Sequence, residues 1–447
     1  MTRVNQWTRR VALSVGVAAG ALCVAAPALV QAQAATPMPD NVAQTPPPPA
    51  PGVDARLDSA RAARGQSLSV AIYTYGPGDE VFERFGHIAL AVADANTGED
   101  IAFNWGVFNF NPITTFVWRF LTGDTRYWMA GYRTFEFNAA YQAQNRTIRK
   151  QVLNLSPAER GALYDLLSWN AQEQNKFYRY DYYNDNCSTR VRDALDWALG
   201  GALRPALDRV SGHHTWRDET ARITADNLPV YAGIQIALGR NADVHLTQWK
   251  LAFLPEYLAR DLAAVPIAGR SLVTTDTVLF TAQRPPMSAT APDRILPALL
   301  LGLGLAALVV GVAWRSGAAL TLVGMSWYLL GGVMGTALLL AGTVTKHVPY
   351  MGSNMSLTAL SPLLLLAAVG WAWRRESSRR GRAARGLAAV VAVLAVAGLA
   401  LMHVPGFSQQ SMMVMMTVVP VHVALAALAA RGTRPVRTEP VSQVLSS

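Results

Sequence analysis

Five long apolar stretches occupy the last third of the chain, and they constrain its fold more than any other feature. Each is long enough, or nearly so, to cross a bilayer as an α-helix, because about 20 apolar residues span the hydrocarbon core. We therefore expect a five-helix transmembrane domain over 291–432, followed by a short tail over 433–447. The stretches lie at about 295–314, 318–342, 356–373, 386–404 and 411–430.

Arginines between and after these stretches predict how the helices are oriented. The formal net charge of +10 would suit nucleic-acid binding, but the arginines gather beside the apolar stretches, which argues for a membrane and against nucleic acid. Cytoplasmic loops carry an excess of Lys and Arg, so these segments and the tail are expected inside the cell. The residues before 291 are then outside it. The basic segments are Arg315, 374–385 and the group Arg431, Arg434 and Arg437.

The N-terminus has the features of an export signal. Three arginines among the first ten residues precede an apolar stretch over 11–30 and a small-x-small cleavage pattern at 32–34. This order predicts a signal peptide over 1–34 that is removed, with an uncleaved membrane anchor as the alternative. The next segment, 35–51, is rich in proline and is expected to form an extended spacer. Together with the arginines, the signal predicts a multi-pass protein of a bacterial inner membrane whose next domain is periplasmic.

The region over 52–290 has the composition of a globular domain with one sizeable core. A capping box at Ser156 and Glu159, with Pro157 at the first helical position, marks a helix start. Strands and helices mix without a βαβ rhythm, so the predicted fold class is α+β. The expected strands are 68–74, 87–92, 101–105 and 146–155, with a short aromatic strand or loop at 178–183, and the expected helices are 157–172 and 188–199.

A single cysteine, Cys187, remains once the export signal with Cys23 is removed. An odd thiol in an exported protein must pair with another molecule, be buried, or be used in chemistry. Cys187 stands directly before a helical pattern, where backbone N–H groups and the helix dipole favour the thiolate. We therefore expect Cys187 to be a nucleophile with a lowered pKa, and the N–H groups at this helix start to hold an oxyanion.

A cysteine nucleophile needs a base, which is normally histidine. Among the seven histidines, His87 follows Phe85-Gly86 and begins an apolar strand, where a polar ring needs a reason to be. The alternative is a core histidine whose hydrogen bonds are satisfied. Sequence spacing alone does not show that His87 and Cys187 meet. The other histidines lie in polar, mixed or membrane segments and are His213, His214, His245, His347, His403 and His422.

Several segments together resemble the Lnb-type lipoprotein N-acyltransferases, and the resemblance covers most of the mature chain. Its most specific parts are the segments that contain His87 and Cys187, and the match in the membrane region is looser. In the periplasmic region it is carried by Tyr75-Gly76-Pro77-Gly78-Asp79, Phe85-Gly86-His87, 103–110, Tyr178-Arg179-Tyr180-Asp181, 185–190, Asp193 and Leu195. In the membrane region it is carried by Thr345-Lys346-His347, Asn354 and Pro362.

The resemblance implies a papain-like (NlpC/P60-type) fold in permuted order, with the histidine before the cysteine. Cys187 would be the nucleophile and His87 its partner. An acyl chain from a glycerolipid ester would pass through a Cys187 thioester to the N-terminal amine of a lipoprotein. In that family the donor is the substrate lipoprotein's own diacylglyceryl group. The partners implied are thus a lipoprotein and a glycerolipid in the membrane.

Two further sets of residues are candidates for supporting roles. Asn104 lies on the strand after His87 and could orient its ring, with Asp79 and Glu83 as rivals and a hairpin residue as the simpler interpretation. His347 and Asn354 fall in the first outer loop, where they could bind a lipid headgroup or the incoming amine, or be merely solvated. Metal-ligand spacings, a phosphate loop and a dinucleotide fingerprint are not found, so neither a metal nor a cofactor is expected.

Two other functions remain open from the sequence. The first is a membrane-tethered cysteine hydrolase that acts on cell-wall peptides or lipid esters; it would use the same Cys187 and His87 but would need access for water. The second is an envelope sensor or assembly factor with an inactive domain. The intact cysteine and histidine segments argue against the second.

Overall fold

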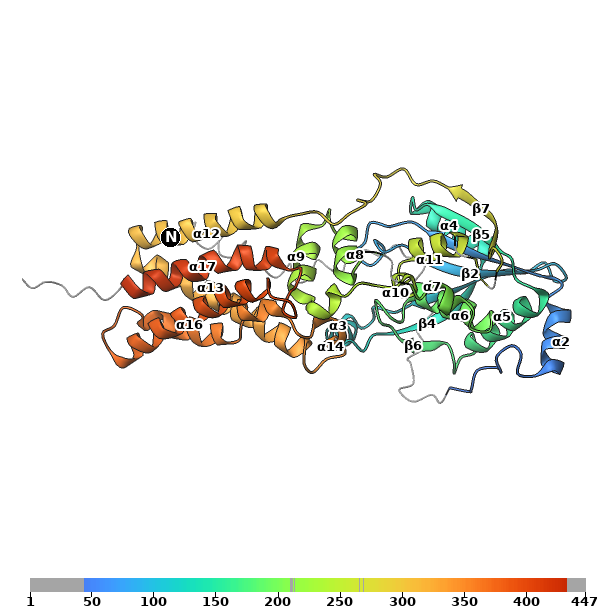
Figure 1. The fold of residues 1–447 in the computed structure, drawn as a ribbon, viewed down its shortest axis with the longest axis horizontal. Coiled ribbons are helices and arrows are strands. Elements are labelled where there is room, and N and C mark those ends of the chain that lie inside the picture. The colour runs from blue at the N-terminus through green and yellow to red at the C-terminus, as the bar shows by residue number, and fades with distance from the viewer. Residues whose placement is uncertain (1–43, 210–211, 213, 265, 268, 432–447) are drawn as a thin grey trace, which may run out of the picture.

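The computed structural model describes residues 44–209, 212, 214–264, 266–267 and 269–431. The predicted signal peptide (1–34), the first part of the predicted spacer (35–43) and the predicted tail (433–447) lie outside these residues. The molecule is elongated, with a mixed sheet-and-helix domain at one end and a bundle of long helices at the other (Figure 1). The predicted α+β domain followed by a helical membrane domain is confirmed.

A seven-stranded sheet forms the centre of the N-terminal domain. Its order is β6-β4-β3-β2-β1-β5-β7, and every neighbouring pair is antiparallel. The predicted hairpin is present, since β2 and β3 pair around a short turn. Strands β4 and β7 were not predicted. The strands are β1 (Leu68–Tyr75), β2 (His87–Asp94), β3 (Asp100–Val107), β4 (Arg126–Arg133), β5 (Ile148–Leu153), β6 (Phe177–Arg179) and β7 (Val273–Phe280).

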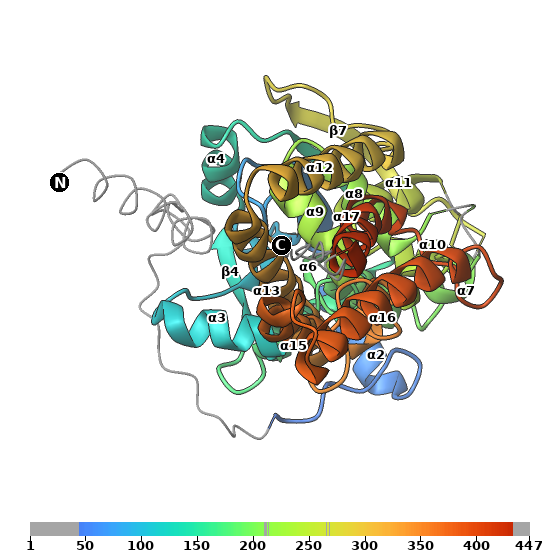
Figure 2. The ribbon, with the colours of Figure 1, turned by 90° about the vertical axis from the view of Figure 1, so that its left-hand side faces the viewer.

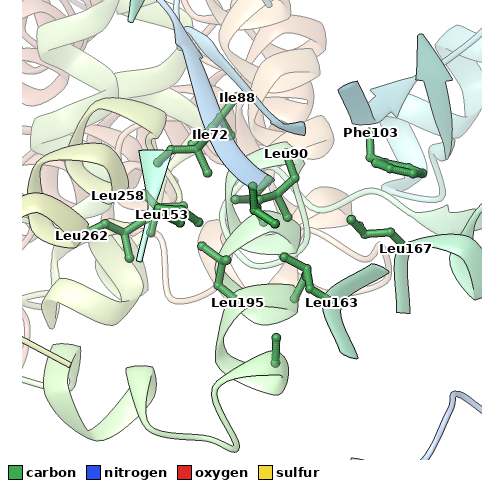
Figure 3. Packing of buried hydrophobic residues seen from close by; sticks show 14 of the residues in the cluster. Ile72, Ile88, Leu90, Phe103, Leu153, Leu163, Leu167, Leu195, Leu258 and Leu262 are labelled. Atoms are coloured by element: carbon green, nitrogen blue, oxygen red, sulfur yellow. The ribbon is translucent and has the colours of Figure 1, made fainter. Parts of the chain in front are cut away.

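One face of the sheet carries the main core. Ile72, Ile88 and Leu90 project from the strands, and leucines of α5 (Pro157–Asn170), α6 (Cys187–Ala198) and α11 (Pro255–Ala264) pack against them (Figure 3). Each of these strand side chains is buried, and alternate residues of a strand face the same side. The capping box at Ser156 is present and begins α5 where it was predicted. This core fixes the helix that begins at Cys187 against the sheet.

The other face of the sheet is covered by α4 (Thr134–Ala143). Small side chains on the strands, including Ala89 and Ala91, leave room there for Phe137 and Tyr141 of α4. Because side chains alternate along β2, His87 lies on this face with Ala89 and Ala91. His87 therefore faces the side of the sheet opposite α6, the helix that begins at Cys187, so the two side chains can meet only at an end of the sheet.

Short helices connect the sheet to the bundle, and α8 and α9 lie directly between the two parts (Figure 1). The sequence interpretation assigned none of them. Helix α9 is apolar but too short to cross a membrane. The remaining helices of the domain are α2 (Ala55–Arg64), α3 (Ile113–Thr122), α7 (Leu203–Leu207), α8 (Trp216–Ile223), α9 (Leu228–Ala237), η1 (Arg240–Asp243) and α10 (Gln248–Leu251).

The bundle has five helical segments that are long and apolar enough to cross a membrane. The third is built of short pieces, and a short helix, α14 (Val348–Met351), lies in the loop before it. The fourth begins at Arg379, capped by Ser378, whereas we predicted a start near 386. Arginine is a good helix former, so the basic segment continues the helix beyond the apolar part. The segments are α12 (Ile295–Arg315), α13 (Gly317–Ala341), Met355–Trp373 (η2, α15 and η3), α16 (Arg379–Leu401) and α17 (Met412–Arg431).

The basic turns of the bundle lie at its end away from the sheet domain (Figure 1). The guanidinium of Arg374 donates to the carbonyl of Gly317 at 3.4 Å, so the turns after the first and third spans are neighbours. This arrangement agrees with the predicted orientation, in which the arginines face the cytoplasm and the sheet domain lies outside. Arg434 and Arg437 lie outside the described residues.

Candidate active site

Cys187 is the first residue of α6, one position earlier than the predicted helix start. Asn186 caps this helix, because its Oδ1 accepts the N–H groups of Ser188 at 2.9 Å and Thr189 at 3.0 Å. The amide nitrogen of Asn186 donates to the carbonyl of Phe253 at 2.9 Å. Because all these groups are buried, the backbone that carries the thiol is held in one position.

The thiol meets the end of the sheet at Gly106. There, β1 ends, β2 begins with His87 and β3 ends. A Cβ atom on Gly106 would lie 3.6 Å from His87 Cε1 and 3.7 Å from Cys187 Cβ, so both side chains stand beside the same residue. Gly106 also has a φ of +105°, which side chains disfavour, and the register of β3 with β4 shifts at this point. The structure thus brings together the predicted cysteine and histidine.

Asn104 is the hydrogen-bond partner of the His87 ring. Its Oδ1 lies 2.5 Å from Nε2 of His87, and the asparagine side chain is only 3% exposed. Because a carbonyl oxygen only accepts, Nε2 carries the proton and Nδ1 keeps a lone pair. The rivals are placed elsewhere: Asp79 is exposed and pairs with Arg284, and Glu83 pairs with Arg146 at 3.6 Å.

Aromatic rings enclose His87. Tyr141 stacks on it with ring centroids 5.9 Å apart, Tyr75 lies 6.2 Å away on the paired strand, and Phe137 meets its edge. Burial lowers the pKa of His87 from 6.5 to about 4; the bond to Asn104 acts in the opposite direction, and nearby Arg146 adds to the lowering. At neutral pH the ring is uncharged and can accept a proton at Nδ1.

Burial also dominates the thiol, and this corrects our expectation of a lowered pKa. It raises the pKa of Cys187 to about 11, although the backbone N–H groups of Ile88 and Ser188 favour the thiolate. Three tyrosines, Tyr127, Tyr178 and Tyr180, lie close enough to Cys187 to interact with it electrostatically. Burial raises the pKa of each of these tyrosines as well. The helix terminus is present, but desolvation by its neighbours outweighs it. In the substrate-free protein the pair is therefore a neutral thiol beside a neutral imidazole.

Fewer N–H groups at the start of α6 are available to hold an oxyanion than the sequence indicated. Asn186 already accepts the N–H groups of Ser188 and Thr189, and the N–H of Ser188 also lies near the Cys187 sulfur. The N–H of Cys187 itself is then the first donor of α6 that could face an oxyanion on a carbonyl bound to the thiol.

Arg146 is a residue of the site that sequence reasoning missed. It lies just before β5, is 3% exposed, and its guanidinium lies 4.6 Å from the centre of the Tyr141 ring. It also donates to the carbonyl of Gly76 at 2.9 Å, at the end of β1. Its charge acts on both His87 and Cys187. An arginine at a strand start has no local signature, because its place beside the site comes from the pairing of β5 with β1.

His347 does not lie beside the Cys187 pair but joins the bundle to the domain. Its Nε2–H donates to the carbonyl of Phe120 at 2.8 Å, and its Nδ1 accepts from the hydroxyl of Tyr182 at 3.2 Å. Tyr350 of the same outer loop donates to Asp181 at 2.6 Å. The loop is thus attached to α3 and to the segment that leads into Cys187.

Asn354 forms a second attachment. Its amide nitrogen donates to the carbonyls of Ile236 and Ala237 of α9, at 2.8 and 3.1 Å. Its Oδ1 accepts from Ser356 and from Gln409 of the next outer loop. These bonds account for all the polar capacity of the side chain. A substrate-binding role for His347 and Asn354 stays a prediction; the contacts seen are structural.

Two other histidines have structural partners. His214 pairs with Glu219 at 2.6 Å, and His422 bonds the carbonyl of Ala359 within the bundle at 2.9 Å. His403 is exposed in the outer loop after α16, and His213 lies outside the described residues.

Taken together, the fold and the site define a multi-pass membrane protein whose N-terminal domain presents a cysteine, histidine and asparagine at one end of an antiparallel sheet. The family model described as Lnb N-terminal periplasmic domain matches residues 57–222, and the one described as Lnb transmembrane domain matches residues 292–431. The chain belongs to the Lnb family, and its N-terminal domain is periplasmic. No curated protein and no solved structure gives a significant match.

Proposed function

We propose that the protein is an acyltransferase of the bacterial inner membrane that moves an acyl chain through a Cys187 thioester to the N-terminal amine of a lipoprotein. One observation carries the proposal. Cys187 and His87 meet beside Gly106, and Asn104 orients the His87 ring. Membership of the Lnb family supports it.

The first half-reaction loads the acyl chain onto the enzyme. Nδ1 of His87 accepts the thiol proton while the sulfur attacks the ester carbonyl of a glycerolipid or of a lipoprotein's diacylglyceryl group. The oxyanion that forms is held by the N–H of Cys187. As the carbon–oxygen bond breaks, His87 returns the proton to the departing alkoxide. The products are an alcohol and a thioester on Cys187.

The second half-reaction delivers the chain. The uncharged amine of a lipoprotein N-terminus attacks the thioester carbonyl, and His87 accepts the proton that the nitrogen loses. The carbon–sulfur bond then breaks, the thiolate recovers a proton from His87, and an amide is released. Each cycle therefore begins and ends with the neutral pair that the burial of both side chains favours.

The surroundings of the thiol favour transfer over hydrolysis. Tyr127 and Tyr180 stack with centroids 4.2 Å apart, and both are close to Cys187. A site lined in this way holds little water, so a thioester there survives until an amine reaches it.

The placement of a thiol at a helix start beside a histidine at a strand start also supports the proposal that the domain is a permuted relative of the papain-like fold.

The mass of a lipoprotein N-terminus tests the function. Cells that produce the full-length protein should carry one more acyl chain on the lipoprotein amine than cells that lack it, and cells with Cys187→Ser at the same level should resemble the latter. Loss of an ester-linked chain without gain on the amine would instead establish a hydrolase. Identical N-termini in all three strains would overturn the proposal.

A further inference from the structure

Helix α3 exposes an apolar surface that no part of the described chain covers. Its sequence, from Ile113 to Thr122, contains one charged residue, Arg119, and no acidic residue. Trp118 is 68% exposed, and four further large apolar side chains of this helix are exposed as well. A run of this kind in a periplasmic domain needs an apolar partner. The four are Ile113, Val117, Phe120 and Leu121.

The contacts of α3 place it at the outer end of a membrane span. The carbonyl of Thr122 accepts the N–H of Lys346 at 2.9 Å, and that of Phe120 accepts from His347 at 2.8 Å. These two loop residues follow closely on Ala341, the last residue of α13. The C-terminal end of α3 is therefore hydrogen-bonded to the loop that follows α13, close to the outer end of this membrane span.

The orientation of α3 also suits a membrane surface. Figure 2 looks along the long axis of the molecule from the bundle end and shows α3 lengthwise, beside α13 and outside the outline of the bundle. The helix therefore runs across the direction of the spans, and none of the five spans found in the described residues lies over its outer part. Helices of the membrane interface lie parallel to the bilayer plane with their apolar side toward the acyl chains.

We propose that α3 is an interfacial helix that buries its exposed apolar side chains in the outer leaflet of the membrane that the bundle crosses. The occupant of this surface is lipid, because the adjoining element of the same chain is a membrane span.

A continuous set of aromatic contacts connects this helix with the catalytic cysteine. Phe116 of α3 lies 5.8 Å from Phe108, which lies 4.8 Å from Tyr127, and Tyr127 is a neighbour of Cys187. Under the proposed function, on which this step rests, an acyl chain leaves the bilayer along these rings. The placement of α3 itself does not depend on acyl transfer.

Site-directed spin labelling tests the placement of α3. Replacing both cysteines, Cys23→Ser and Cys187→Ser, leaves the full chain without a thiol and without its nucleophile. Trp118→Cys and Leu121→Cys then receive a nitroxide, and the protein is placed in phospholipid nanodiscs. The matched control is Phe135→Cys on α4, because Phe135 is 67% exposed and helix α4 lies at the end of the molecule away from the bundle.

The readout is the ratio of collisions with oxygen, which enters lipid, to collisions with a water-soluble nickel complex. We expect this ratio to be several-fold higher at Trp118 and Leu121 than at Phe135. Equal ratios at all three sites would overturn the proposal, as would labels shielded from both reagents, which would show that protein covers α3. Two positions on α3 keep the test decisive if one variant does not fold. Because the chain used cannot transfer acyl groups, a negative result here leaves the proposed function untouched.

Discussion

At the scale of single residues, the site consists of a neutral thiol and a neutral imidazole that an asparagine orients. A thiolate at rest would require surroundings that stabilise charge, whereas the burial of Cys187 disfavours charge, and Tyr178 and Tyr180 lie nearby. In the proposed mechanism the nucleophile is therefore formed only when His87 accepts the thiol proton during attack. The raised pKa of Cys187 differs from the lowered pKa that we expected from its position at a helix start. The position in the helix can be predicted from the local sequence, whereas burial depends on the tertiary structure.

Substitutions at the three residues should separate their roles. Cys187→Ser and His87→Ala are expected to lower acyl transfer by roughly a thousandfold or more, because each removes a reacting group. Asn104→Ala should cost less, roughly tenfold to a hundredfold, because the ring remains but loses its fixed tautomer. Transfer is measured on the purified full chain, with thermal unfolding to confirm that each variant folds. Full activity of Cys187→Ser would show that the nucleophile is elsewhere.

The lowered pKa of His87 predicts the acidic limb of the reaction. The ring accepts a proton from the thiol only when it is uncharged, and it becomes charged only as the pH falls through about 4. The rate at which a small activated ester acylates Cys187 should therefore change by no more than about twofold between pH 7 and 5.5. A histidine with an ordinary pKa of about 6.5 would lose roughly tenfold over the same range.

The stability of the folded protein sets the lowest pH at which these rates can be compared. Between pH 6.5 and about 4 the unfolded chain binds a proton at His87 that the folded chain does not, so the free energy of unfolding falls as the pH falls. Rates are therefore compared at pH 5.5 and above. An acidic midpoint near 6.5 or higher would contradict the buried, neutral histidine.

At the scale of elements, Gly106 is the point where three strand ends and α6 converge. Alanine there would have a strained backbone, costing about 1–2 kcal/mol, and its methyl would fill the space beside His87 and Cys187. Gly98 has a similar strained backbone, with φ of +74°, but nothing lies within 4 Å of its Cβ position. Gly106→Ala and Gly98→Ala should therefore lower the stability of the full chain alike.

Activity should distinguish these two glycines. Only Gly106→Ala is expected to lower acyl transfer, by roughly tenfold or more, because the added methyl excludes the ester carbonyl from both reacting groups. Equal activity of the two variants, measured with the same lipoprotein, would show that the space beside Gly106 is not where the substrate binds.

Elements with a strong local pattern could be predicted from the sequence. The strand that begins at His87 and the hairpin after it show continuous apolar runs, and α5 begins with a capping box at Ser156. The start of α6 at Cys187 was also indicated by its flanking residues. The cysteine and histidine of the candidate site could be predicted from the sequence for the same reason, since a lone cysteine and a histidine at a strand start are both distinctive local features.

Other elements were missed, or carry no such pattern. Helix α3 has an apolar side opposite Thr115, Arg119 and Thr122, but the sequence interpretation assigned no helix to these residues. Strand β7 is mostly exposed at the sheet edge, where neither face is buried. Arg146 and the tyrosines around Cys187 come from four separate strands or loops, and only tertiary pairing brings them together. The pKa of the thiol depends on those neighbours and could not be anticipated.

At the scale of the whole molecule, the outer loops of the bundle hold the periplasmic domain in place. His347 contacts α3 and Tyr182, and Asn354 contacts α9 and Gln409. The ends of the sheet that carry the site are therefore fixed relative to the membrane. In the proposed reaction between two lipid-borne substrates, this position would decide whether an ester carbonyl reaches Cys187.

Removing one attachment should lower transfer without disabling the thiol. His347→Ala is expected to reduce acyl transfer by roughly tenfold to a hundredfold, while iodoacetamide alkylates Cys187 at an unchanged rate. The matched control is His403→Ala, since His403 is exposed in the neighbouring outer loop. Amide hydrogen exchange should become faster at 120–123 and 346–352 only in His347→Ala. Reduced transfer with unchanged exchange would indicate direct contact with substrate instead of a positioning role.

The central claim is that an acyl chain becomes covalently bound to Cys187, and intact mass measurement tests it most directly. The purified full-length protein is mixed with a diacylated lipoprotein, quenched in acid within the first turnover and analysed by mass spectrometry. We predict that the peptide containing Cys187 gains the mass of one acyl group, that neutral hydroxylamine removes it, and that Cys187→Ser never shows it. Acyl transfer to the lipoprotein amine with no adduct on Cys187 at any time would contradict the account.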